Sequence, residues 1–166
     1  AILTAAIGVV APSAPAASSA PAAGTTAHNA ATTTDLSAND KQTLRDYAAT
    51  TWQSFVAMVD ADSGLPADKL GVDGTRSIET STTNIGAYLW STLVAERLGL
   101  IDHDEVVSRL TTTIGTLETM ERHTASGQYY TWYDFRTGAK LTVWPPTGVP
   151  LTPNLSSVDN GWLATG

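Results

Sequence analysis

The sequence of 166 residues has no cysteine and few basic residues, with nine lysines and arginines against sixteen acidic residues. Without cysteine, neither a disulfide framework nor a thiolate metal site can form. The formal net charge of −7 leaves no Lys/Arg stripe that could release counterions from a phosphate backbone. These absences exclude disulfide-stapled scaffolds and argue against a nucleic-acid partner.

Motifs for metals and cofactors are also missing. The three histidines, His28, His103 and His123, do not stand at metal-ligand spacing. No glycine-rich phosphate loop and no Gly-x-Ser-x-Gly elbow is present. We therefore expect neither a metal nor a cofactor.

The first 38 residues lack aromatic side chains and consist mostly of alanine, threonine, proline and serine. Such a segment buries too little apolar surface to offset the entropy of ordering, so we expect disorder before a domain at 39–166. Residues 1–10 resemble the end of a signal-peptide apolar region and precede small-residue cleavage sites. They predict a truncated export signal and a bacterial secreted or cell-surface protein. An Ala/Pro linker within a longer protein is the alternative, and the run is too short for a membrane span.

Apolar residues recur at helical spacing over about 39–59, 82–98 and 103–120, and a fourth helix begins at 156 or 157. The second segment is apolar all round, which indicates burial on both sides and places Trp90 in the core with Trp52. The third has one apolar stripe. A buried helix closely followed by a one-sided helix is the unit of a two-layer helical barrel, although a small helical bundle would show the same pattern.

One segment between the helices favours strands. Residues 128–134 are rich in β-forming side chains, residues 135–138 supply a turn, and residues 140–144 can return as a second strand. We therefore expect a β-hairpin inserted between the third and fourth helices.

Two polar clusters, at 79–86 and 155–162, stand directly before helices. The spacing between them puts both clusters at the same end of two parallel helices. Free backbone N–H groups at helix starts favour hydrogen-bond acceptors, and hydroxyl, amide and carboxylate side chains held there suit a sugar. The alternative is that the serines only cap their helices.

Glycoside cleavage needs two carboxyl groups across the scissile bond, one protonated and one ionised. The loops and helix starts offer Asp68, Asp73, Glu79, Asp134 and Asp159. From these we select Asp73, Glu79 and Asp159 as candidate catalytic residues. We expect Thr80, Ser81, Asn84, Trp132 and Asn160 to bind the sugar. The rings of Trp132 and Tyr133 suit either stacking on a sugar or packing in a hairpin.

Six short motifs together resemble a known family. They are GLP at 64–66, TSTTNIG at 80–86, LGLI at 98–101, LETMER at 117–122, YTWYD at 130–134 and SVDNG at 157–161. In this order, over about residues 40–166, the chain resembles bacterial glucoamylase-like proteins. That family includes exported β-1,2-glucanases and a domain of cyclic β-glucan synthases.

The resemblance implies an all-α fold, part of an (α/α)6 barrel, with an oligo- or polysaccharide partner and hydrolysis with inversion or a related glycan reaction. It places a set of residues in the sugar groove: Asp68, Thr80, Ser81, Asn84, Trp132, Tyr133, Asp134, Asp159 and Asn160. Thr82 stands where a proline is usual, and both suit a first helical position. The sequence supplies the N-terminal part of such a barrel, so we do not expect catalysis by this part alone. A non-catalytic glycan-binding or cell-surface helical module is the alternative function.

Overall fold

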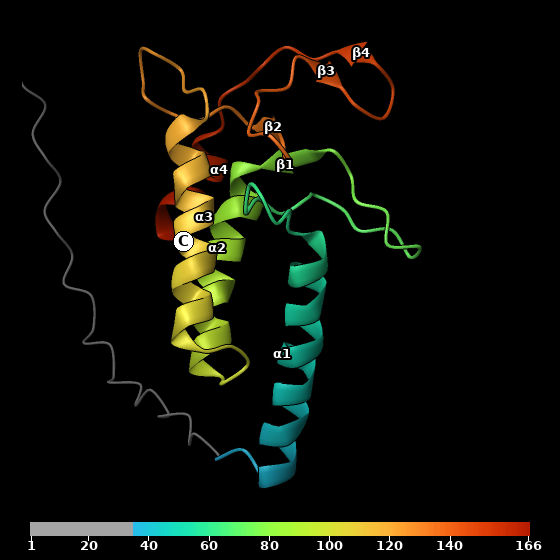
Figure 1. The fold of residues 1–166 in the computed structure, drawn as a ribbon, viewed down its shortest axis with the longest axis vertical. Coiled ribbons are helices and arrows are strands. Elements are labelled where there is room, and N and C mark those ends of the chain that lie inside the picture. Colours follow the sequence, from blue (N-terminus) through green and yellow to red (C-terminus); the bar gives the residue numbers. More distant parts are fainter. Residues whose placement is uncertain (1–34) are drawn as a thin grey trace, which may run out of the picture. The chain divides into compact units, whose positions relative to one another are not determined.

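The computed structural model describes residues 35–166, drawn as a ribbon in Figure 1. This part of the chain contains four helices and four short strands. Their bounds are α1 Ala38–Met58, β1 Glu79–Ser81, α2 Thr82–Arg97, α3 His103–Thr119, β2 Trp132–Asp134, β3 Val143–Trp144, β4 Val149–Pro150 and α4 Ser157–Thr165. The predicted export signal lies outside the described residues.

Each helix begins at a polar residue whose side chain accepts a hydrogen bond from the third helical amide. The four N-caps are Ser37, Ser81, Asp102 and Ser156. Capping of this kind satisfies one of the amides that a helix start leaves free. The predicted helix starts are therefore confirmed.

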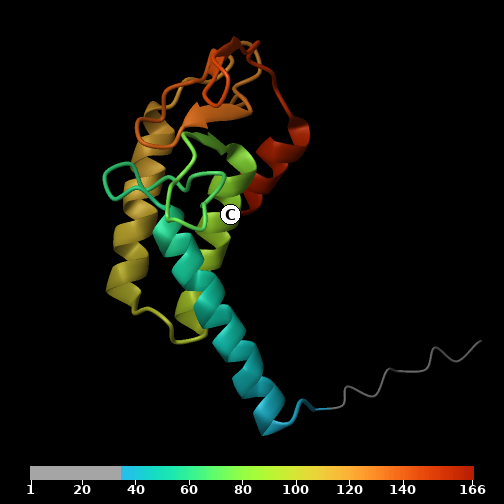
Figure 2. The same cartoon turned by 90° about the vertical axis from the view of Figure 1, so that its right-hand side faces the viewer.

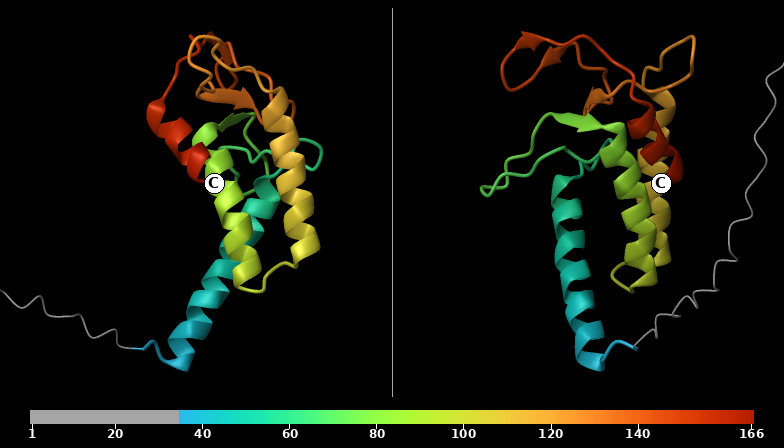
Figure 3. Two further views of the ribbon diagram at one scale, coloured as in Figure 1. Left: turned by 90° about the vertical axis from the view of Figure 1, so that its left-hand side faces the viewer. Right: turned by 180° about the vertical axis from the view of Figure 1, so that it is seen from behind.

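The four helices run alternately up and down, and α2 lies at the centre. The short loop at 98–102 joins α2 to α3 at one end, whereas the long connections at 59–78 and 120–156 lie together at the other (Figure 2). Consequently α2 and α4 both begin at the end that carries the strands (Figure 3). They pack closely at Gly86, where an added Cβ would overlap the backbone of Trp162 and Leu163.

The core lies on the faces of α2 that its neighbours cover. One cluster gathers Leu65, Ile85, Leu117 and Phe135. A second joins α1 to α2 through Trp52, whose ring stacks on that of Tyr88 with centroids 6.2 Å apart. Trp52 is therefore a core residue, as predicted.

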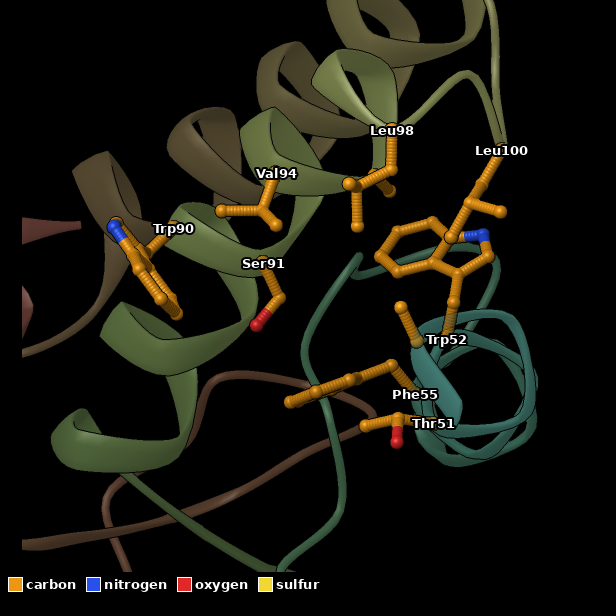
Figure 4. A pocket seen from close by; sticks show the side chains of 10 residues that line it. Thr51, Trp52, Phe55, Trp90, Ser91, Val94, Leu98 and Leu100 are labelled. Atoms are coloured by element: carbon orange, nitrogen blue, oxygen red, sulfur yellow. The ribbon is translucent and has the colours of Figure 1, made fainter. Parts of the chain in front are cut away.

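The prediction of burial is wrong for Trp90, which is 60% exposed. The described helices cover the side of α2 that carries Ile85 and Leu89, and they leave the opposite side open. Trp90 and Val94 instead line an apolar groove of about 190 Å³ between α1 and α2, together with Phe55 (Figure 4).

The strands pair differently from the prediction. β2 pairs antiparallel with β1, with Tyr133 opposite Thr80. The partner of β2 is thus the strand that directly precedes α2 in the sequence, and not residues 140–144 as predicted. The expected pairing survives as a single bridge between Tyr133 and Lys140. β3 instead turns back onto β4, because the amide of Gly148 donates to the carbonyl of Trp144 at 2.8 Å and closes a tight turn. The chain is thus mostly helical, with small antiparallel strand pairs.

No helix within residues 35–166 is both long and apolar enough to cross a bilayer.

Candidate functional site

The two polar clusters meet in space. The hydroxyl of Thr83, in the first turn of α2, donates a 2.7 Å hydrogen bond to the carboxylate of Asp159, in the first turn of α4. Their helices begin at Ser81 and Ser156, which lie far apart in the sequence. The prediction that both helix starts share one end of the fold is therefore confirmed.

Beside this junction, four side chains form a continuous polar chain, which we call the carboxylate cluster: Asp68, Lys69, Glu79 and Asn84. The amide of Asn84 donates to Asp68 Oδ1 at 2.8 Å. The ammonium of Lys69 lies 3.1 Å from Asp68 Oδ2 and 3.0 Å from Glu79 Oε1. The backbone fixes this arrangement, because the amide of Asp68 donates to the carbonyl of Glu79 and holds the loop against β1.

The two carboxylates of the cluster differ in burial. Glu79 is only 1% exposed, whereas the side chain of Asp68 is 20% exposed and that of Lys69 is 64% exposed. Hydrogen bonds to Glu79 and then to Asp68 raise the pKa of Lys69, so its ammonium stays charged at neutral pH. The cluster therefore presents an exposed cation beside the partly exposed carboxylate of Asp68, groups that can bind hydroxyls as a donor and as an acceptor.

Two tryptophans stand next to the carboxylate cluster. The rings of Trp132 and Trp144 meet edge to face, with centroids 5.3 Å apart and planes at 71°. The ammonium of Lys69 lies 5.8 Å from the centre of the Trp144 ring, within the range of a cation–π contact. Both rings are only partly buried.

Other predicted binding residues lie in the protein interior. Tyr133 is fully buried; its hydroxyl donates to the carbonyl of Glu121 at 2.6 Å and accepts from the amide of Tyr130 at 2.7 Å. Its ring therefore packs in the core and offers no face to a sugar. Thr80 is also fully buried, and no partner for its hydroxyl lies within residues 35–166.

Burial raises the pKa of Tyr133 to about 12, compared with 10.0 for a free phenol. The folded state thus holds the phenol proton more tightly than the unfolded state does. This contribution to stability is fully present below about pH 10 and disappears as the pH rises through 12. We expect the unfolding free energy to fall by roughly 1 kcal/mol between pH 9 and pH 11 on this account.

Urea denaturation at the two pH values measures this change. Tyr133→Phe should remove it, whereas Tyr47→Phe, at an exposed position of α1, should leave it in place. An equal pH dependence in wild type and Tyr133→Phe would contradict the assignment.

Two predicted acids are engaged in local turns. Asp73 lies in an exposed loop, where hydrogen bonds from Thr75 lower the pKa of Asp73. Partial burial opposes ionisation of Asp134, but the hydrogen bonds and charge of Arg136 outweigh it and lower the pKa of Asp134. The structure does not join either acid to the carboxylate cluster by a hydrogen bond or an ion pair within residues 35–166.

Asn160 fixes the backbone instead of facing an open site. Its amide oxygen accepts from the amide of Tyr129 at 2.9 Å, and its nitrogen donates to the carbonyl of Tyr129 at 3.0 Å. The same nitrogen reaches the carbonyl of Ser156 at 2.9 Å. Both functional groups of the Asn160 side chain are thereby used to tie α4 to the segment before β2.

Sequence reasoning missed Lys69 and did not select Trp144 as a binding residue. The signal for Lys69 was slight, since it is a single lysine directly after Asp68 in a loop. Its role emerges only when the loop and β1 come together and place Glu79 beside it.

The chain has a glucoamylase-like fold, with its long connections at one end of the helices. Two solved structures share it: a protein provisionally described as a glucoamylase from Bacteroides caccae (TM-score 0.59, 20% identity) and the endo-β-1,2-glucanase from Chitinophaga pinensis, solved with sophorotriose and glucose (TM-score 0.58, 21% identity). They cover 74% and 77% of this chain, and the chain covers 29% of each.

The chain belongs to the family described as Protein of unknown function (DUF3131), whose model matches residues 46–139. It is also 35% identical over 125 residues to the cyclic β-(1,2)-glucan synthase NdvB of Rhizobium meliloti (strain 1021). That match covers 73% of this chain and 4% of the synthase. The glucoamylase-like resemblance seen in the sequence is thereby confirmed.

Proposed function

We propose that this chain contributes to a glycan-processing enzyme and binds a β-glucan at the carboxylate cluster. The observation that carries the proposal is the polar chain from Asn84 through Asp68 and Lys69 to Glu79, with two partly exposed tryptophans beside it. Two relatives are described as a β-1,2-glucanase and a cyclic β-1,2-glucan synthase, so β-1,2-linked glucose is the proposed ligand.

We further propose that the helices form part of an (α/α)6 barrel in a bacterial secreted or cell-surface protein. Large apolar side chains remain exposed on three of the helices, with Trp90 and Leu93 on α2, Ile114 on α3 and Trp162 on α4. A nearest-neighbour array of helical pairs leaves apolar surfaces of this kind where further pairs would stack. The apolar groove between α1 and α2 supports the same proposal, because it is a further apolar surface that the described helices do not cover (Figure 4).

The two ion pairs of Lys69 determine which roles we propose for Asp68 and Glu79. A general acid must hold a proton, yet Asp68 and Glu79 share one ammonium as charged partners. In this proposal the partly exposed Asp68 accepts hydrogen bonds from sugar hydroxyls, and the buried Glu79 holds Lys69 in place. Asp159, at the junction of the two helix starts, is the proposed base that activates water, and the proton-donating acid is a group outside the cluster.

The second candidate function is a non-catalytic glycan-binding module. The sharing of Lys69 by two carboxylates also favours this function, because such a cluster can bind hydroxyls without transferring a proton. The two candidates differ in one measurable product, the reducing ends released from the glucan.

The test of the proposed site is calorimetric titration with β-1,2-gluco-oligosaccharides. Asp68→Asn and Asn84→Ala should each weaken binding about tenfold or more, because each removes a hydrogen bond that involves a charged group. The matched control Asp62→Asn lies in an exposed turn and should bind as wild type. Binding that neither site variant changes would remove the proposed site. Release of reducing ends is measured on the full-length protein: release that disappears in Asp159→Asn would support the hydrolase, and binding without any release would support the module.

A further inference from the structure

The β3–β4 hairpin carries Trp144 at the end of the fold where the two helix starts meet (Figure 1). Its valines remain open to solvent: Val143 is 44% exposed and Val149 is 57% exposed. An apolar core therefore does not hold the hairpin in place. Its aromatic contact runs from Trp144 to Trp132, and its contact with a charge runs from Trp144 to Lys69.

We propose that Trp132 and Trp144 form a stacking platform for a second sugar unit of the β-glucan, next to the unit bound at the carboxylate cluster. This inference rests on the proposed function and adds a subsite to it. An indole ring offers a flat apolar face and an N–H donor, which match the apolar face and the hydroxyl rim of a glucose ring.

Lys69 connects the platform to the cluster. The ammonium that touches Asp68 and Glu79 also faces the ring of Trp144, so the ring centre lies at most about 9 Å from the carboxylate oxygens. When one glucose unit of the glucan binds the carboxylate cluster, the adjacent unit therefore lies over the two tryptophan rings. Lys69 acts here as a positioning residue, since its charge fixes the orientation of Trp144.

Packing alone does not account for this pair of rings. A tryptophan that serves only to anchor a hairpin would be expected deep in an apolar cluster with its neighbours. Trp144 is instead half-buried, and its neighbours are a charged side chain and a second half-buried ring. Aromatic and hydrogen-bonding groups are therefore brought together on one accessible surface.

The experiment compares oligosaccharides of two lengths, a β-1,2-linked glucose disaccharide and the corresponding pentasaccharide. For the wild type we expect the pentasaccharide to bind about tenfold more tightly, as measured by calorimetry and by quenching of tryptophan fluorescence. Trp144→Ala should abolish this difference while leaving disaccharide affinity within a factor of about two. Trp144→Phe should keep most of the difference, because it keeps an aromatic face.

Val149→Ala, an exposed change in the same hairpin, is the matched control and should bind both sugars as wild type does. Thermal denaturation of each variant checks that the fold is intact. An unchanged length dependence in Trp144→Ala, or an equal loss for both sugars, would overturn the platform while leaving the carboxylate cluster as the binding site. A wild-type chain that binds neither sugar would overturn the proposed function as well.

Discussion

Replacement of Gly86 by alanine is expected to loosen α4 from α2 and to raise amide exchange across residues 157–165 by roughly 100-fold. A Cβ at this position would lie 2.7 Å from the carbonyl carbon of Trp162 and 2.8 Å from the Cα of Leu163, both of which are backbone atoms that no rotamer change can move. Overpacking of this kind costs about 1–3 kcal/mol, and rigid neighbours favour the upper limit. Such a loss corresponds to the stated rise in exchange, because α4 then opens locally more often.

Gly161 provides a control in the same pair of helices. It lies in α4 with no atom within 4 Å of an added Cβ, so alanine there removes only the conformational freedom of glycine. Gly161→Ala should therefore slow amide exchange in α4, with a gain of about 0.5–1 kcal/mol. The same chemical change thus has opposite signs at two positions. Equal effects at both would contradict the close packing of α2 and α4.

Local sequence signals were sufficient to predict the helices. Ser37, Ser81, Asp102 and Ser156 each stand before an apolar periodic run, and each caps a helix that begins close to its predicted start. Capping depends on a side chain and an amide only a few residues apart, so it can be predicted from the sequence without knowledge of the fold.

Long-range pairing could not be predicted in the same way. Strand β1 has three residues and merges directly into α2, so it shows no alternation of its own. Its partner β2 lies about fifty residues later, and the nearer segment around Lys140 offers an equally good local pattern. The exposure of Trp90 has the same cause, since the composition of a helix does not tell which of its faces a neighbour will cover.

The site was predicted in part for related reasons. Asp68, Glu79 and Asn84 come together, and Asp159 meets the first turn of α2. Tyr133 and Asn160 have the right chemistry for a sugar, but the fold uses their polar groups to bind backbone atoms. A sequence shows which side chains could bind a hydroxyl, whereas only the packing shows which of them remain free to do so.

Replacement of Lys69 by methionine is expected to lower the unfolding free energy and to weaken glycan binding. The carboxylate of Glu79 is almost completely buried and would lose its charged partner, a change that costs about 3–5 kcal/mol when both groups are buried. The exposure of Lys69 reduces the expected loss of stability, because water can partly replace the ammonium as a partner of Glu79. Methionine keeps the length of the aliphatic stem, so the loss reports the charge and not the packing.

Lys140→Met is the matched control, since Lys140 also pairs with a glutamate, but that partner, Glu121, is 57% exposed and remains hydrated. We expect Lys140→Met to lower the unfolding free energy less than Lys69→Met does. The double variant Lys69→Met/Glu79→Gln should recover most of the stability, because a neutral amide replaces the unpaired buried charge. It should not recover binding, since the exposed ammonium beside Asp68 is still missing. The double variant would then regain stability but not glycan affinity. This result would distinguish an ion pair that only stabilises the fold from one that also takes part in ligand binding.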